Sequence, residues 1–272
     1  MLRSNFLKGA TRPGAIAALA ILGSIAAAGA GAVDPQVQQI LAPSGKLRVG
    51  LYPGTPTSIL PDAPGGPRGV GYEVGKEVAR RLGVPYEPVV FARNAEVLEA
   101  VKTGTVDMAF TNASAARAKE MDFGPPYIEI ELGYLIPKGQ KIPTLGAVDT
   151  TGIRVGVTKG SSSEAVLSRD LNYATVVPVE TVGDAVGMLA AGQLDVFATN
   201  KATLFEMSEK LPGSTVLEGK WGVERHAIAI PKGRDQGRAF VDKFTEDATS
   251  EGLVKAAIEH AGLRGATTPR QK

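Results

Sequence analysis

Apolar and polar positions alternate between strand-like and helix-like patterns along the first half of the chain. The expected elements, in order, are a strand at 46–52, a helix at 72–83, a strand at 86–91, a helix at 94–104 and a strand at 105–110. In the first helix Val74, Val78 and Leu82 share one face. Gly83 then ends the periodic pattern. This alternation predicts an α/β fold with a mostly parallel, doubly wound sheet.

The second half of the chain repeats this plan. "TVDMAFTN" (105–112) and "QLDVFATN" (193–200) share an aspartate at the third position and Thr-Asn at the end, and a glycine stands directly before each of them. The elements expected around the second copy are a strand at 152–160, a helix from 161, a strand at 174–179 and a helix at 181–192. The repeat predicts two equivalent lobes, in which Asp107 and Asp195 have structural roles.

Two segments with a shared ending predict how the lobes are joined. Residues 133–139 and 226–233 are strand-like and both end Ile-Pro-Lys-Gly, so we interpret them as crossings between the lobes. The predicted boundaries are lobe I at 45–131 and 226–264, lobe II at 135–222, and a polar tail at 265–272 that we expect to be disordered.

The first 32 residues have the composition of a leader. A basic start precedes an uncharged run from Gly14 to Ala32, which is rich in alanine and glycine and ends in an A-x-A cleavage pattern. We therefore predict a cleavable signal peptide at 1–32 and a periplasmic product. An uncleaved membrane anchor is the alternative, although its apolar part is short for a span of about 20 residues. The chain has no cysteine, which excludes a lipid-anchored lipoprotein and disulfides.

The charge balance and the lack of metal-site motifs narrow the function classes. The whole chain carries 30 basic and 28 acidic residues, and three of the basic ones lie in the leader, which leaves 27 against 28, or −1. This balance offers no polybasic basis for nucleic-acid binding. His226 and His260 are isolated in the sequence, and no metal-ligand spacing or phosphate-binding loop occurs, so neither metal nor cofactor is expected.

Several motifs occur in a fixed order after the leader. They are "GKLRVG", "EAVKTGTVDMAFTN", "ARAKEMDFGPPY", "GIRVGVTKGSSSEAVL" and "AAGQLDVFATN". In this order the chain resembles the family 3 extracellular solute-binding proteins, the periplasmic receptors of polar amino-acid ABC importers, over about residues 45–262. The resemblance implies a type II periplasmic binding fold whose two lobes clamp a small carboxylate-bearing ligand. It also implies a membrane permease and an ATPase as partners, and we expect a monomer.

The resemblance assigns the ligand carboxylate to Arg117. Family members carry an arginine six residues before the phenylalanine that is Phe123 here, and a guanidinium binds a carboxylate as a bidentate fork. Thr111 and Asn112 directly follow a predicted strand, where ligands of open α/β sheets bind. The family usually has serine or threonine at the position of Asn112, and a local helix cap is the alternative role for this residue.

The start of the helix from 161 is a second candidate region. Ser161 and Ser162 match positions where family members carry hydroxyl residues that touch the ligand, and free backbone N–H groups favour an anion there. Ser161 with Glu164 also fits a capping box, and the two roles are compatible.

Asn200 departs from the family pattern. Family members usually have an acid here that receives the α-ammonium of the ligand, and burying an ammonium without a carboxylate is costly. Either another acid, Glu129 or Glu224, takes over, or the ligand lacks a cationic amine. A cap for the helix at 201–210 is a third interpretation of Asn200.

The aromatic walls of the family cleft are altered as well. Thr55 stands where a tyrosine is usual, and Asn94 stands at another frequent wall position, although it also fits a helix cap. Tyr52, Phe91 and Tyr127 are candidates to supply the missing ring.

Three functions fit these observations. The leading hypothesis is a non-enzymatic substrate-binding protein of an ABC importer that closes around its ligand by a hinge. An exported enzyme similar to cyclohexadienyl dehydratases would need a general acid, and the spacing does not choose among Glu73, Glu129 and Glu164. A ligand sensor acting in trans is the third.

Overall fold

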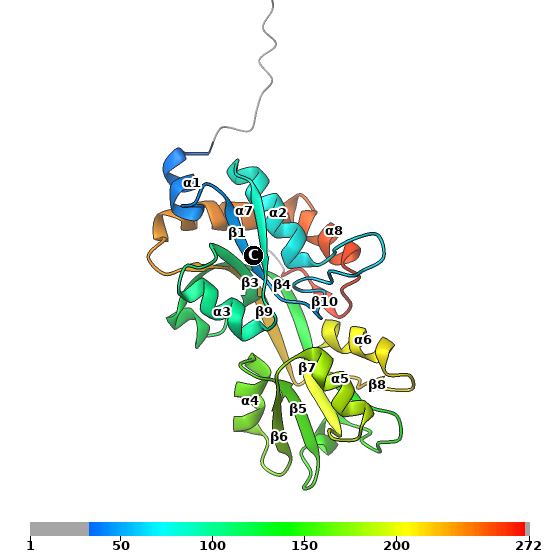
Figure 1. Ribbon diagram of the computed structural model, residues 1–272. Coiled ribbons are helices and arrows are strands. Elements are labelled where there is room, and N and C mark those ends of the chain that lie inside the picture. The colour runs from blue at the N-terminus through cyan, green and yellow to red at the C-terminus, as the bar shows by residue number, and fades with distance from the viewer. Residues whose placement is uncertain (1–32, 270–272) are drawn as a thin grey trace, which may run out of the picture. The chain divides into compact units, whose positions relative to one another are not determined.

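The computed structural model describes residues 33–269 (Figure 1). The predicted signal peptide at 1–32 lies outside the described residues, as do positions 270–272 of the predicted tail. Within the described part of the chain, no helix combines the length and apolarity that a membrane crossing requires.

Lobe I is a three-stranded parallel sheet with its helices. Its elements are α1 (Pro35–Leu41), β1 (Leu47–Leu51), α2 (Val70–Leu82), β2 (Tyr86–Val90), α3 (Asn94–Lys102), β3 (Met108–Asn112), η1 (Arg117–Lys119), η3 (Asp235–Gly237), α7 (Arg238–Ser250) and α8 (Leu253–His260). The predicted apolar stripe of α2 is buried in the core of this lobe, at Val74, Val78 and Leu82. Gly83 ends the helix in the left-handed conformation, with φ of 76°.

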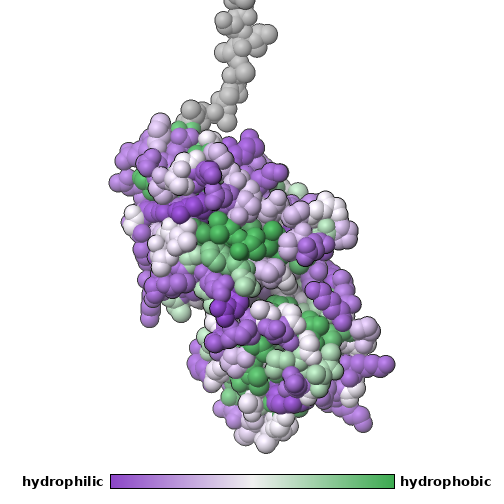
Figure 2. All heavy atoms as spheres, viewed as in Figure 1, coloured by the Kyte–Doolittle hydropathy of each residue, from purple (hydrophilic) through white to green (hydrophobic). Residues whose placement is uncertain are grey.

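Lobe II is built in the same way. Its elements are η2 (Leu145–Val148), β5 (Arg154–Thr158), α4 (Ser162–Asp170), β6 (Thr175–Val179), α5 (Val182–Ala190), β7 (Val196–Asn200), α6 (Lys201–Lys210) and β8 (Thr215–Val216). Its core is separate from that of lobe I and packs around β5 and β7. The face shown in Figure 2 is largely hydrophilic, with apolar positions gathered in limited areas of each lobe.

The sheet confirms the expected doubly wound α/β architecture. The strand order is β2-β1-β3 in lobe I and β6-β5-β7 in lobe II, and all these pairs are parallel. Each lobe therefore places the carboxyl ends of its strands at one edge, where a ligand of an open α/β sheet binds.

Two antiparallel strands connect the lobes. β4 (Met121–Ile136) pairs with β9 (Gly222–Pro231) over most of its length, and its last residues pair with β7 of lobe II. β9 in turn pairs with β3 of lobe I. β4 begins well before the crossing segment expected at 133–139. The prolines at its start are accommodated because the register shifts around Pro126, and such irregularities tolerate proline in a strand.

The repeated aspartates have equivalent contacts in the two lobes. Asp107 is fully buried and accepts hydrogen bonds from the backbone N–H, Nε and Nη2 of Arg48, and from Arg234 Nη1. Asp195 accepts the same three bonds from Arg154, and a fourth from Gln140 Nε2. Each aspartate ties the segment before β3 or β7 to the start of β1 or β5, which is the structural role expected of both.

Two expectations about local structure are wrong. Asn94 is the first helical residue of α3, because Arg93 has the extended backbone of a cap position, with φ of −138° and ψ of 150°. The described part of the tail is ordered, because Ala266 and Thr267 form β10 and pair with β4. The short helix α1 was not expected, although Asp34 caps its N-terminus by accepting a hydrogen bond of 2.8 Å from the Gln36 backbone.

Candidate functional site

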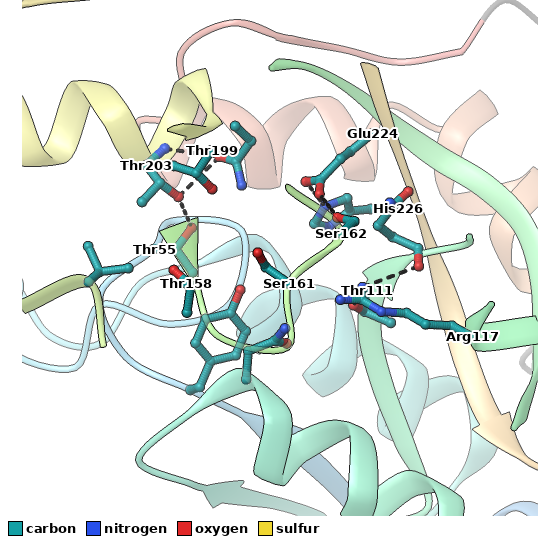
Figure 3. A pocket seen from close by; sticks show the side chains of 15 residues that line it. Thr55, Thr111, Arg117, Thr158, Ser161, Ser162, Thr199, Thr203, Glu224 and His226 are labelled. Carbon is teal, nitrogen blue, oxygen red and sulfur yellow. Dashed lines mark hydrogen bonds and ion pairs between the residues drawn. The ribbon is translucent and has the colours of Figure 1, made fainter. Parts of the chain in front are cut away.

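One pocket lies between the lobes at the carboxyl ends of the strands (Figure 3). All nine candidate residues line it: Tyr52, Thr55, Asn94, Thr111, Asn112, Arg117, Ser161, Ser162 and Asn200. The other lining residues are Thr158, Val182, Thr199, Thr203, Glu224 and His226. The lining side chains leave a cavity of about 40 Å³ between them.

Arg117 supplies the positive charge of the pocket. Its Nη1 donates to Thr111 Oγ1 at 2.7 Å and to the Asn112 carbonyl at 3.4 Å. Burial lowers the pKa of this arginine, while Glu224 and Tyr52 oppose that shift. No carboxylate among the described residues forms an ion pair with it. Part of the guanidinium fork is thus available to an anionic ligand group.

Asn112 is held in place by the neighbouring crossing strand. Its Oδ1 accepts a hydrogen bond of 3.0 Å from the backbone N–H of Arg225 in β9. The amide NH₂ is then the part of the side chain left to donate, beside Arg117. Asn112 does not cap a following helix, since its side-chain oxygen binds β9.

The N-terminus of α4 contributes two serines with different roles. Ser161 is the cap residue, and its Oγ accepts from the Glu164 backbone N–H at 3.1 Å. Glu164 binds the backbone N–H of Gly160 instead of completing a capping box with Ser161. Ser162 Oγ donates to Glu224 Oε1, so this hydroxyl joins lobe II to the crossing strand β9.

Glu224 and His226 form a buried pair that the sequence had not revealed. Both lie on the inward face of β9, and His226 Nε2 is 3.2 Å from Glu224 Oε2. Burial alone would raise the pKa of Glu224, but the hydrogen bonds from His226 and Ser162 and the charge of Arg117 lower it. The pocket therefore contains an ionised carboxylate at neutral pH. His260, like His226, lies beside a glutamate in the fold, because its Nδ1 is 2.8 Å from Glu73 Oε1.

Asn200 is a helix cap that also lines the pocket. Its Oδ1 accepts from the backbone N–H of Thr203 at 3.0 Å and from the Thr203 hydroxyl at 3.1 Å. The Thr203 hydroxyl also lies 2.8 Å from the Thr55 hydroxyl across the cleft. Thr55 thus joins lobe I to α6 at the place where an aromatic wall was expected.

Of the three aromatic candidates, one lines the pocket and two pack away from it in lobe I. Tyr52 lines the pocket, and burial together with Glu224 raises its pKa to about 12. Tyr127 is buried in the lobe I core against Phe110 and does not line the pocket. Phe91 packs in the second apolar cluster of lobe I, also away from the pocket lining.

The acids considered for a catalytic role do not line the pocket. Glu129 of β4 pairs with Arg225 of β9, and Glu73 pairs with His260. Within residues 33–269 no group of three or more histidine, aspartate or glutamate side chains could hold a metal ion.

Similar proteins agree with this fold. The ABC transporter glutamine-binding protein of Bacillus subtilis is 26% identical over 188 residues, which are 68% of this chain and 64% of that protein. A solute receptor for L-cysteine of Neisseria gonorrhoeae is 26% identical, with a TM-score of 0.73 over 82% of this chain and 92% of the receptor.

A third likeness concerns the enzyme alternative. An ancestral amino-acid-binding protein, described as a precursor of cyclohexadienyl dehydratase, is 22% identical, with a TM-score of 0.70 over 82% of this chain and 97% of its own. Proteins related to this chain are mostly binding proteins without enzymatic activity. The solved structures share the type II periplasmic binding fold. The chain matches the bacterial extracellular solute-binding proteins, family 3, over residues 47–261, and it belongs to that family.

Proposed function

We propose that this protein is the substrate-binding component of an ABC importer and captures a small carboxylate-bearing solute, an amino acid or a close relative. The observation that carries the proposal is Arg117, a pocket guanidinium with no carboxylate partner among the described residues, surrounded by hydroxyl and amide groups. The names of the relatives support the same class, since they refer to glutamine and L-cysteine.

The proposed mechanism is hinge closure. The ligand binds at the strand ends of lobe I, through Arg117 and Asn112, and the hydroxyls of α4 and α6 then complete its environment from lobe II. Such contacts favour the closed form by their differential affinity, and no covalent step is required.

Thermal shift against a panel of amino acids and organic acids tests the proposal. A ligand at 100 times its Kd adds about 2.7 kcal/mol, which corresponds to a rise in melting temperature of about 5–10 °C for a chain of this size. The variant Arg117→Met should lose the rise for every carboxylate ligand. Arg169→Met is the matched control, because Arg169 is exposed and pairs with Asp170 outside the pocket. A flat response across the whole panel would refute the proposal.

We further propose that the chain is exported to the periplasm through cleavage after residue 32 and that it binds without turnover. N-terminal sequencing of the periplasmic protein tests the first point. Incubation with prephenate and arogenate tests the second, and formation of phenylpyruvate or phenylalanine would overturn it. Uptake of labelled ligand by a deletion strain separates transport from sensing in trans.

A further inference from the structure

The pocket contains a cation and an anion that are not paired with each other. Among the fifteen lining residues, Arg117 carries a positive charge and Glu224 a negative one. No ion pair joins them, and Figure 3 shows both side chains toward the same side of the pocket. A ligand with one anionic and one cationic group can therefore pair with both side chains, and no unpaired charge is then buried.

Asn200 is unsuited to an ammonium. Its Oδ1 already accepts two hydrogen bonds from Thr203, one of which caps α6. The remaining part of the amide is an NH₂ group, which donates and does not accept. An ammonium also donates only, so the side chain of Asn200 presents the wrong polarity to it as well as no charge.

Glu224 has free acceptor capacity in the same pocket. A carboxylate has about four lone-pair sites, and here Ser162 uses one on Oε1 and His226 uses one on Oε2. No lysine or arginine among the described residues forms an ion pair with it. The other acid considered from the sequence, Glu129, is paired with Arg225 at 2.8 Å and does not line the pocket.

We propose that Glu224 receives the α-ammonium of the ligand and that the ligand is a zwitterionic α-amino acid, with its carboxylate on Arg117. The ammonium acceptor of this site is thus a glutamate of the crossing strand β9, and Asn200 at the end of β7 binds an acceptor group of the ligand instead. This inference rests on the proposed function, because it requires a carboxylate ligand in this pocket.

Calorimetry with matched ligands tests the assignment. The probes are the twenty proteinogenic L-amino acids and, for each one that binds, the 2-hydroxy acid with the same side chain, which keeps the carboxylate and lacks the ammonium. Glu224→Gln preserves size and one acceptor oxygen but removes the charge. It should weaken the amino acid by at least about 30-fold, as expected for unpairing a buried charge, and change the 2-hydroxy acid by less than about 3-fold.

Two further variants make the result specific. Glu129→Gln is the control for an acid outside the pocket and should change neither ligand class. Asn200→Leu should weaken the amino acid and the 2-hydroxy acid to a similar extent, because its amide does not contact the ammonium. Melting temperatures without ligand verify that each variant is folded.

The outcomes separate this inference from the proposed function. If 2-hydroxy acids bind the unchanged protein as tightly as amino acids do, or if Glu224→Gln weakens both classes equally, Glu224 is not the ammonium acceptor although a carboxylate ligand exists. If no amino acid binds but another carboxylate of the thermal-shift panel does, this inference alone is overturned, and if no member of the panel binds, the proposed function is overturned as well.

Discussion

Replacing Asp107 by asparagine should destabilise the protein far more than the equivalent change of Asp195. Each aspartate accepts four hydrogen bonds, but Asp107 is fully buried and faces two guanidiniums, those of Arg48 and Arg234, whose side chains are 25% and 14% exposed. The single guanidinium at Asp195, that of Arg154, is 42% exposed and can turn to water.

The magnitudes follow from what each variant leaves behind. Asp107→Asn removes the counter-charge of two largely buried cations and places an NH₂ donor among donors, which costs about 3–5 kcal/mol. Asp195→Asn weakens hydrogen bonds whose donors can be resolvated, at about 1–2 kcal/mol. For a chain of this size the melting temperature falls by about 2–4 °C for each kcal/mol, so the expected losses are about 10 °C and about 4 °C.

Urea unfolding followed by far-ultraviolet circular dichroism measures both variants, because this signal reports the helices of the two lobes together. Fluorescence of Trp221, the single tryptophan, reports lobe II separately. An equal loss for the two variants, or a larger loss for Asp195→Asn, would refute the reasoning from burial and partner number.

Three further predictions concern packing, pH and the contact between lobes. A Cβ on Gly156 would lie 2.5 Å from a leucine side-chain carbon, so Gly156→Ala should lower the free energy of unfolding by about 1–3 kcal/mol in the same urea assay. A Cβ on Gly187 meets no neighbour within 4 Å, so Gly187→Ala should stabilise α5 by about 0.5 kcal/mol. Hydrogen bonds from two arginines of α2, partly offset by burial, lower the pKa of Glu77 from 4.5 to about 2. Its stabilisation, about 1 kcal/mol after solvent screening, is therefore complete above pH 4.5 and lost as the pH falls toward 2, and the melting temperatures of the parent and Glu77→Gln should converge over that range. Thr55→Val removes the hydroxyl that contacts Thr203 and should lower the free energy of unfolding by about 1 kcal/mol. An unchanged stability would contradict that contact, and so would an equal loss in Thr55→Ser, which keeps the hydroxyl.

Much of the fold could be predicted because its signals are local. The stripe of Val74, Val78 and Leu82 and the stop at Gly83 depend on a few neighbouring positions, and the structure contains that helix with a start two residues earlier than expected. The repeat of two octapeptides placed Asn112 and Asn200 at equivalent strand ends, and both line one pocket.

The parts that could not be predicted depend on distant partners. Thr203 was overlooked as a pocket residue, since its contact with Thr55 joins positions 148 residues apart. The choice between Glu129 and Glu224 required the pairing of β4 with β9, which sets them on opposite faces of the ribbon. Spacing along one strand cannot reveal that register.

The charge of the pocket depends on which side chains of β9 point inward from the two-stranded ribbon that it forms with β4. Along β9, Glu224 and His226 point inward, whereas Arg225 between them is exposed and bound to Glu129. Because side chains alternate with a period of two, the insertion or deletion of one residue before this point would turn Arg225 inward and Glu224 outward. A change that leaves every helix and both lobes intact would then put a second guanidinium in the pocket in place of its carboxylate, and a pocket with two guanidiniums would favour a dianionic ligand.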